Sequence, residues 1–198
     1  MRLIFDTETN GLPVCKAFGF FPLYTNTAKY NNARIVQVSY IITDDNYNKL
    51  EESDTIIRAD GFPIENHQFH GITEQISQTN GVGFMDFAEK FNNSLDLIET
   101  LTAHNIDFDF NVICAEFYRY GLLDIIAKME SKKQICTMKK YKKLVGATFK
   151  NGKDLKYPNL KELYHFATGR VMENHHNSMY DTRNLWEAIK IIESGAPC

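Results

Sequence analysis

The sequence predicts an α/β fold whose sheet begins antiparallel and continues with parallel crossovers. Two observations indicate this: three short apolar runs come early in the chain, and later apolar runs alternate with helical patterns. With 198 residues, of which 43% are hydrophobic and 13% aromatic, the chain can bury a full core as a single domain, 1–198. No linker, internal repeat or low-complexity segment divides the sequence.

Five short apolar runs are predicted to form strands. The run RLIF opens the chain as a buried first strand, and RIVQVSYII follows after an irregular stretch. Turn-forming residues at 43–49 separate the second predicted strand from the third. The predicted strands span residues 2–5, 34–42, 54–59, 99–105 and 134–138.

Helical patterns fill the segments between and after these strands. In the last of them, Leu185, Ala188 and Ile192 recur at a spacing that places them on one helix face. An earlier one opens at Pro158 and closes at Gly169, residues typical of a helix start and a helix end. The predicted helices span residues 73–78, 82–97, 110–123, 158–167 and 182–192.

An aromatic insert at about 12–33 separates the first two predicted strands. Its length of roughly twenty residues exceeds that of a hairpin turn, and it contains Phe18, Phe20, Phe21, Tyr24 and Tyr30. Exposed aromatic side chains can stack on nucleic-acid bases. Aromatic residues that cover a sheet edge are the commoner case, so both interpretations stay open.

Charge is distributed unevenly along the chain. The net charge is −3, but residues 128–156 hold ten lysines against Glu130 and Asp154, a local balance of +8. The remainder, with 12 basic and 23 acidic residues, then carries −11. Such asymmetry can mark a phosphate-facing patch on an acidic body. A solvated lysine-rich face would give the same pattern.

Cysteine usage and hydropathy indicate a cytoplasmic protein that does not span a membrane. The four cysteines are scattered without a C-x-x-C pair, so we expect free thiols in a reducing cytosol instead of a zinc site or disulfides. No apolar run approaches the ~20 residues of a membrane helix. The first eleven residues do not resemble a signal peptide, because their apolar run stops at Phe5.

Two acidic residues follow the first predicted strand. Asp6 and Glu8 are two positions apart, so their side chains lie on the same face at the rim of the sheet. Two like charges there favour a bound cation, and Mg²⁺ and Mn²⁺ prefer oxygen ligands. Alone, the pattern is weak evidence, because surface strands often end in this way.

Further acidic residues occur at two later junctions of the predicted elements. Asp107 and Asp109 stand where the fourth strand meets its helix, and strand ends are where α/β proteins build their sites. Asp181 stands at the start of the last helix, after His175 and His176. A histidine beside a bound water can act as a general base near neutral pH. A pair of surface histidines is the plain alternative.

Taken together, these patterns resemble the DEDDh 3′–5′ exonuclease family, the DnaQ-like group of the RNase H-like superfamily. The resemblance rests on the motifs FDTETNGL at 5–12, HNIDFD at 104–109 and HNSMYD at 176–181, with FHGITEQ at 69–75 and NLKELY at 159–164 in support. Within this family, the sequence resembles free-standing bacterial and phage exonucleases of the DNA polymerase III epsilon-like type. The fold implied is a mixed five-stranded sheet with an antiparallel start, flanked by helices.

The resemblance implies a catalytic set in which four carboxylates hold two divalent ions, Mg²⁺ or Mn²⁺. Asp6 would bridge the two ions, Glu8 and Asp181 would complete one site, and Asp109 would hold the other ion. The family spacing selects His176 as general base, five residues before Asp181. Position 177 is asparagine, which excludes the tyrosine variant of the superfamily. The product would be a nucleoside 5′-monophosphate.

The resemblance also suggests substrate contacts near the 3′ end. Leu12 matches an apolar wedge residue, Thr9 and Asn10 would lie near the last nucleotide, and His70 lies in a loop that lines the nucleotide pocket in relatives. His104 and Asn105 complete the expected substrate-binding set. For the wedge, loop and turn positions, core or turn packing is the alternative.

The implied partner is the 3′ end of single-stranded nucleic acid, with DNA favoured and RNA possible. The sequence ends about seventeen residues after Asp181, which favours a free-standing enzyme over one bound through a long tail, although a DNA polymerase partner is compatible with the pattern. The rival interpretation is a catalytically silent nucleic-acid-binding or polymerase-associated scaffold domain. No feature decides the oligomeric state.

Overall fold

A mixed sheet forms the centre of the molecule. The computed structural model describes residues 1–17, 19–172 and 177–195, and within them five strands lie in the order β3-β2-β1-β4-β5. β1 pairs antiparallel with β2 and β2 antiparallel with β3, whereas β4 is parallel to β1 and β5 is parallel to β4. The strand bounds are Arg2–Thr9, Ile35–Thr43, Lys49–Ile56, Thr100–Ala103 and Lys133–Cys136, for β1 to β5 in turn. The predicted fold class is confirmed.

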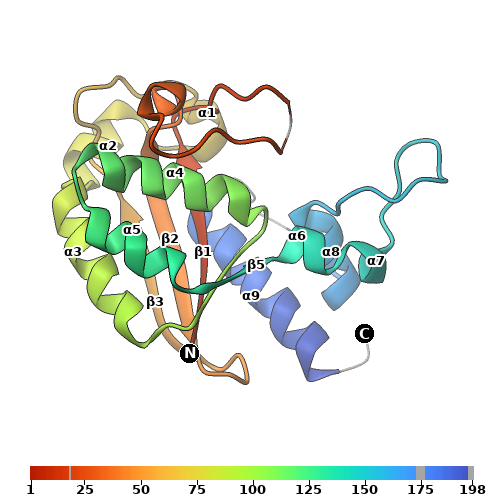
Figure 1. Cartoon of the computed structure of the whole chain (residues 1–198). Helices are drawn as coiled ribbons and strands as arrows, with labels where there is room; N and C mark the ends of the chain where they lie inside the picture. The colour runs from red at the N-terminus through yellow and green to blue at the C-terminus, as the bar shows by residue number, and fades with distance from the viewer. Residues whose placement is uncertain (18, 173–176, 196–198) are drawn as a thin grey trace.

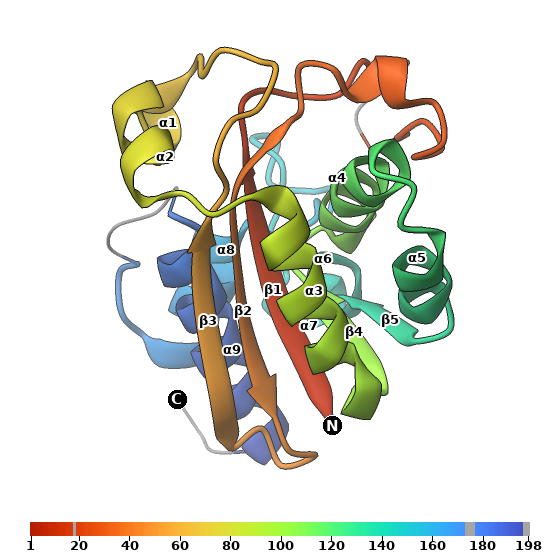
Figure 2. The same ribbon diagram turned by 90° about the vertical axis from the view of Figure 1, so that its left-hand side faces the viewer.

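Helices cover both faces of this sheet (Figures 1 and 2). The helices α3, α4 and α5 cover one face, at Phe84–Ser94, Ile106–Arg119 and Leu123–Glu130. The helices α8 and α9 cover the other, at Leu160–Thr168 and Ser178–Ser194. The remaining helices are α1 His67–His70, α2 Glu74–Asn80, α6 Thr137–Lys140, α7 Lys142–Val145 and the 3₁₀ turns Thr27–Tyr30 and Leu95–Leu97. None of the helices in the described ranges is long and apolar enough to cross a membrane.

The central strand β1 distributes its side chains between two separate cores. Leu3 and Phe5 belong to the core shared with α3, α4 and α5, whereas Ile4 belongs to the core shared with α8 and α9. Side chains alternate along a strand, so Asp6 and Glu8 share the side of Ile4. This alternation directs both carboxylates toward α9.

Three predicted element starts differ from the structure by four residues or more. β3 begins at Lys49 where the sequence predicts 54, because this edge strand pairs only with β2 and carries polar, exposed side chains at its start. α4 begins at Ile106, ahead of the predicted 110, after Asn105 takes the left-handed conformation with φ 77°. α9 begins at Ser178, ahead of 182. α1, α5, α6 and α7 were not predicted.

The aromatic insert packs against α4. The Phe21 ring lies 5.7 Å from that of Phe108, and the Tyr24 ring lies 6.2 Å from that of Tyr118. Tyr30 is buried. These contacts support a covering role for the insert, although some of its side chains, Leu12 among them, stay exposed. Phe18 lies outside the described residues.

Candidate active site

Three carboxylates converge at the carboxyl end of β1. Asp6 and Glu8 on the strand and Asp181 in the first turn of α9 each offer an oxygen, and these oxygens all lie within 4.8 Å of one another. All three residues are partly exposed, so a cation could reach them from solvent. Strand alternation and the position of α9 thus bring the acidic residues of the first and the last motif together.

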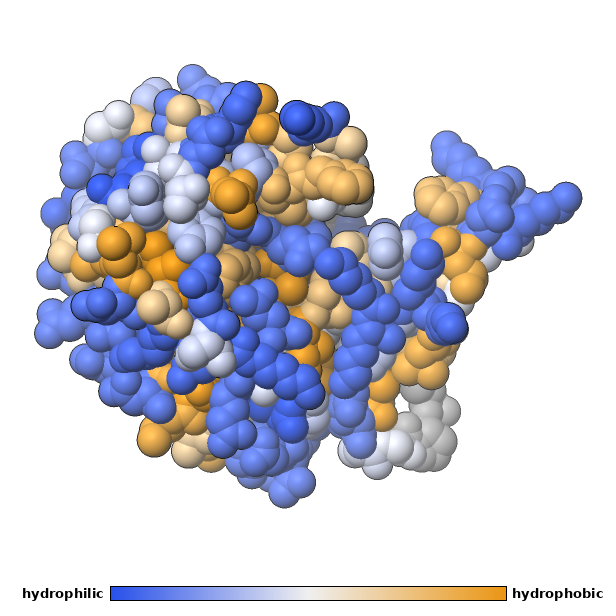
Figure 3. Space-filling model, in the orientation of Figure 1, coloured by the Kyte–Doolittle hydropathy of each residue, from blue (hydrophilic) through white to orange (hydrophobic). Residues whose placement is uncertain are grey.

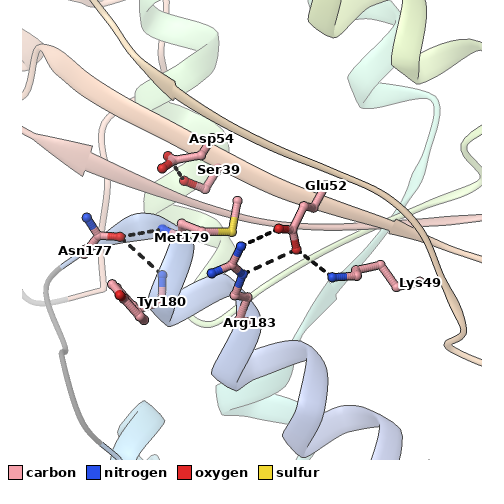
Figure 4. Close-up of polar contacts among 8 residues, drawn as sticks. All are labelled: Ser39, Lys49, Glu52, Asp54, Asn177, Met179, Tyr180 and Arg183. Atoms are coloured by element: carbon pink, nitrogen blue, oxygen red, sulfur yellow. Dashed lines mark hydrogen bonds and ion pairs between the residues drawn. The ribbon is translucent and has the colours of Figure 1, made fainter. Parts of the chain in front are cut away.

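The first turn of α9 is anchored directly to the strand that bears Asp6. The Asn177 side chain caps the helix by accepting from the backbone N–H groups of Met179 and Tyr180, at 3.2 and 3.3 Å (Figure 4). The buried Ser178 hydroxyl donates to the backbone carbonyl of Asp6 at 2.6 Å. This bond fixes the first turn of α9, which carries Asp181, against β1.

A buried amide connects the same turn to β2 and β3. The Ser178 backbone N–H donates to Gln37 Oε1 at 3.3 Å, and Gln37 Nε2 donates to Asp54 Oδ1 at 2.7 Å. The Ser39 hydroxyl donates to the same Asp54 oxygen at 2.8 Å (Figure 4). Asp54 thereby fixes which end of the Gln37 amide faces α9.

An ion pair holds the second turn of α9 against the sheet edge. The Arg183 guanidinium pairs with Glu52 of β3, which also accepts from Lys49 Nζ at 2.8 Å (Figure 4). These two cations lower the pKa of the Glu52 carboxyl to about 2, with the hydrogen bond from Arg183 as the main cause. The helix that carries Asp181 is therefore fixed at several points.

The fourth predicted carboxylate, Asp109, is held by Thr7. Asp109 lies in the first turns of α4 and is 2% exposed. Its Oδ1 accepts from the Thr7 backbone N–H at 3.0 Å and from the Thr7 hydroxyl at 2.8 Å. Thr7 lies between Asp6 and Glu8 on β1, so these two hydrogen bonds join α4 to the strand that carries both carboxylates.

The electrostatics of the cluster favour proton or cation binding. Burial, with Asp181 and Asp109 nearby, raises the pKa of Glu8 to about 8. Burial also raises the pKa of Asp109 to about 7, against the opposing hydrogen bonds from Thr7. The pKa of Asp6 is raised well above its usual value by burial and then by the charges of Asp109, Glu8 and Asp181. A donor set of carboxylate oxygens that repel one another fits Mg²⁺ or Mn²⁺.

A cavity of about 640 Å³ opens beside Glu8. Leu12, Phe69 and Phe108 contribute apolar walls, and Thr9 and His70 line it too. Leu12 and Phe69 are largely exposed, so apolar surface faces solvent next to the carboxylates. The cavity therefore combines a charged end with an apolar surface on which a base can pack.

The expected substrate residues of the first motif differ in their contacts. Thr9 donates its hydroxyl to the Gly11 carbonyl at 2.7 Å, which stabilises the turn after β1. Asn10 is buried and bonds the 63–66 loop: its Oδ1 accepts from the Glu65 N–H at 2.5 Å, and its Nδ2 donates to the Pro63 carbonyl at 3.1 Å. Asn10 therefore positions the loop that leads to α1 and His70.

His70 is buried at the end of α1 and lines the cavity. Its Nδ1 accepts from the Ile72 backbone N–H at 3.1 Å, which assigns the proton to Nε2. Burial lowers the pKa of His70, so the ring is neutral at physiological pH. A neutral ring with a fixed tautomer can offer a hydrogen bond without adding charge.

His104 bonds two other elements of the protein through both ring nitrogens. Its Nδ1 lies 3.0 Å from the Thr137 hydroxyl at the end of β5, and its Nε2 lies 3.0 Å from the Pro158 carbonyl ahead of α8. Burial lowers its pKa to about 4. The neighbouring Asn105 instead lines a second cavity of about 500 Å³ with Leu12, Phe21 and Phe108. The expected substrate role fits the surroundings of Asn105 better than those of His104.

The predicted general base, His176, lies outside the described residues, as does His175. Asn177, the next described position, caps α9 within four residues of Asp181. The described chain therefore resumes four residues before Asp181.

Three residues of the site were missed by the sequence analysis. Thr7 stood in the first motif as a spacer between two acidic residues, and only the packing of α4 reveals its contact with Asp109. Ser178 and Gln37 lie far apart in the sequence and meet through tertiary contacts. The one available signal was the position of Thr7 between Asp6 and Glu8. Because side chains alternate along a strand, the Thr7 hydroxyl must face the side opposite to the two carboxylates.

Comparison with known proteins identifies a family and a fold. A family model described as an exonuclease, RNase_T, matches residues 3–189. Curated protein sequences gave no match. Exonuclease I of E. coli in its zinc-bound complex with single-stranded DNA has a TM-score of 0.73 and 20% identity, covering 99% of this chain and 41% of that chain. Exonuclease I from Methylocaldum szegediense gives 0.71 and 19%, covering 99% and 41%.

A third solved structure has a length close to that of this chain. Exonuclease X in complex with 5′-overhanging duplex DNA has a TM-score of 0.58 and 20% identity, covering 100% of this chain and 95% of that chain. By contrast, this chain spans about 41% of the exonuclease I structures. At these identities the likeness concerns the fold.

Proposed function

The chain belongs to the RNase_T exonuclease family, and from this premise we propose that it is a metal-dependent 3′–5′ exonuclease acting on single-stranded nucleic acid. Family membership confirms the resemblance noted in the sequence. The convergence of Asp6, Glu8 and Asp181 within 4.8 Å carries the proposal. The similar solved structures are complexes of exonuclease I with single-stranded DNA and of exonuclease X with 5′-overhanging duplex DNA. They support DNA as the favoured polymer, with RNA as the other candidate.

The carboxylates have distinct roles in this proposal. Asp6 would help to hold both of two divalent ions, Glu8 and Asp181 would complete the site of one, and Asp109, which Thr7 holds outside the three-carboxylate cluster, would serve the other. Mg²⁺ or Mn²⁺, when bound, supplies Lewis-acid stabilisation of the charge that develops on the phosphate. Each carboxylate must lose its proton to bind a cation, which the raised pKa values make dependent on pH.

The remaining chemistry belongs to side chains around the cavity. His176 takes a proton from the attacking water while the water oxygen bonds to phosphorus. The bond between phosphorus and the 3′-oxygen of the remaining strand breaks, that 3′-oxygen takes up a proton from solvent, and a nucleoside 5′-monophosphate leaves. Leu12 and Phe108 pack against the terminal base, while the neutral His70 offers its Nε2 proton to the nucleotide.

Digestion of end-labelled strands tests the proposal. Purified protein is incubated with 5′-labelled single-stranded DNA and RNA in Mg²⁺, Mn²⁺ or EDTA, beside Asp6→Ala and His176→Ala. We expect a metal-dependent ladder that shortens from the 3′ end and that both substitutions reduce by orders of magnitude. Asp60→Ala, which removes an exposed carboxylate outside the cluster, should cut like the wild type. If the wild type binds both polymers and leaves them intact, the protein is instead a silent nucleic-acid-binding or scaffold domain.

Two wider expectations stay proposals. A DNA polymerase partner would place the site in proofreading, whereas a free-standing enzyme would degrade strands directly; copurification with a polymerase would separate these roles. The cytoplasmic location rests on the thiols of Cys15, Cys114 and Cys136, which are free in the described chain.

A further inference from the structure

The sheet divides the lysine-rich segment into two groups. Lys128, Lys132 and Lys133 precede or begin β5, whereas the other seven lysines follow its end. β5 runs parallel to β4, and β4 runs parallel to β1. The second group therefore emerges at the same sheet edge as Glu8, at the carboxyl ends of these strands. The first group lies at the opposite end.

Residues 142–157, which we name the basic arm, form α7 and a small hairpin that stands away from the body (Figure 1). The hairpin is closed by the Thr148–Leu155 bridge and by the bond from the Phe149 N–H to the Asp154 carbonyl at 3.0 Å. Phe149 and Tyr157 are 56% and 46% exposed. An isolated hairpin with exposed aromatic rings lacks the packing that usually explains such residues.

The charge of the basic arm is largely uncompensated. It carries five lysines and one acidic residue, Asp154, a net charge of +4. Lys156 pairs with Glu162, but in the described part of the chain no carboxylate pairs with Lys142, Lys143, Lys150 or Lys153. Lys142 Nζ lies 4.6 Å from the centroid of the Tyr157 ring, so the ammonium groups of Lys143, Lys150 and Lys153 are the ones available to a polyanion on a protein that is acidic elsewhere.

The base of the basic arm is joined to the candidate active site. Pro158, the next residue after the arm, accepts a bond from His104, and Lys139 ahead of the arm pairs with Asp107 of α4. Asp107 lies two residues before Asp109 on the same helix. Figure 3 shows an open notch between the arm and the upper part of the body.

We propose that the basic arm binds the phosphate backbone of a single strand upstream of the 3′ end that occupies the active site. Lys150 and Lys153 contact phosphates, and Phe149 and Tyr157 stack on bases. This proposal rests on the proposed function, because it names how that substrate is held. The arm contacts no base edge in this role, so it holds strands of any sequence.

Salt-dependent binding tests the basic arm without requiring catalysis. Fluorescence anisotropy of a labelled single-stranded oligonucleotide is measured in EDTA over a range of salt concentrations, for wild type, K150Q/K153Q and the matched control K132Q/K133Q. Each phosphate contact on a single strand contributes about 0.7 to the slope of log K against log salt. K150Q/K153Q should therefore reduce the magnitude of this negative slope by about 1.4, and the control should leave it unchanged.

A second variant separates stacking from charge. Phe149→Ala should weaken oligonucleotide binding by about fivefold or more, with the salt slope preserved, because stacking releases no counterions. Equal binding by K150Q/K153Q, K132Q/K133Q and wild type overturns the proposal. Failure of the wild type to bind the strand in EDTA does so too, as does binding of anionic lipid vesicles in place of the strand.

The proposed function is checked separately on the wild-type protein. Hydrolysis of the p-nitrophenyl ester of thymidine 5′-monophosphate requires only the active site. If the ester stays intact while the arm variants lose binding, the exonuclease proposal fails and the docking role of the arm stands. If the ester is cleaved but K150Q/K153Q binds the strand as the wild type does, the exonuclease proposal stands and the docking role of the arm fails.

Discussion

Glu8 illustrates how the protonation of single residues depends on their neighbours in this site. Its carboxylate lies beside those of Asp6 and Asp181. Burial, followed by the charges of Asp181 and Asp109, raises its pKa from 4.5 to about 8. A metal-free protein therefore holds protons at neutral pH that the unfolded chain releases. Cation binding must displace these protons.

The stability of the metal-free protein should consequently fall as pH rises. Between pH 4.5 and about 8 the native Glu8 binds a proton that the unfolded state has lost, so the free energy of unfolding decreases through this range. Thermal unfolding in EDTA across these pH values measures the effect. Glu8→Gln should flatten the profile, whereas the exposed control Glu51→Gln should not. A profile that rises through this range in EDTA would contradict the raised pKa.

Thr7 is the residue whose removal should affect metal binding most specifically. Its hydroxyl donates to Asp109 Oδ1 at 2.8 Å, and Thr7→Val keeps the shape while it removes that donor. Loss of such a supporting bond should weaken Mn²⁺ binding by about tenfold or more. Isothermal titration calorimetry measures this, and Thr7→Ser, which retains the hydroxyl, should restore the affinity. Equal affinities for the valine and serine variants would show that the hydroxyl has no such role.

At the scale of elements, the site depends on how α9 meets the sheet. Asn177 caps the helix, Ser178 bonds the Asp6 carbonyl, and Arg183 pairs with Glu52 of the edge strand. Asp181 lies between these anchors. The position of one carboxylate is thus determined by bonds to β1, β2 and β3, none of which involves the carboxylate itself.

Two helix caps allow a matched test of this anchoring. Asn177→Ala and Asn159→Ala each remove an asparagine cap, from α9 and α8, and each should lower the free energy of unfolding by about 1 kcal/mol. Only the α9 cap adjoins Asp181, so only Asn177→Ala should also weaken Mn²⁺ binding. Chemical denaturation and calorimetry measure the two effects. Equal losses of metal affinity in both variants would assign the effect to stability alone.

Elements differ in how far the sequence can predict them. The runs at 2–5 and 34–42 are apolar because β1 and β2 are buried on both faces. α8 begins two residues after the predicted 158 and ends, as expected, ahead of Gly169. β3 escapes prediction at its start because an exposed edge strand needs no apolar residues. α1, α6 and α7 have four residues each, too few for a helical periodicity to show.

The site shows the same division between local pattern and tertiary contact. Asp6 and Glu8 follow from strand alternation, which is a local property, whereas Asp109 and Asp181 are selected through the resemblance to the exonuclease motifs. The contact between Gln37 and Ser178 depends on the packing of α9 against β2, and no local signal encodes it. His104 carried a motif signal, yet its two bonds to Thr137 and Pro158 belong to the tertiary structure.

At the scale of the whole molecule, stability rests on two cores separated by the sheet. An aromatic group in the larger core includes Phe84, Phe87, Phe91 and Phe117, whose ring centroids lie 5.4 to 6.5 Å apart in contacting pairs. This group lies on the face away from Asp6 and Glu8. The sheet therefore separates this aromatic group from the cluster of Asp6, Glu8 and Asp181.

Truncation in this aromatic group should lower stability while the metal site persists. Phe117 is fully buried, so Phe117→Ala should reduce the free energy of unfolding by about 3 to 5 kcal/mol. Phe20, 74% exposed, is the control, and Phe20→Ala should change it by less than about 0.5 kcal/mol. Urea denaturation measures both. Similar values for the two variants would contradict the packing described for α4.

The bond between Ser178 and Asp6 spans 172 positions of the sequence, and this has a consequence during synthesis. A ribosome delivers β1 long before α9, so a nascent chain holds Asp6 and Glu8 without Asp181. The proposed hydrolytic centre therefore assembles only after the last helix has emerged. Until then, the nascent chain carries an incomplete cluster of carboxylates.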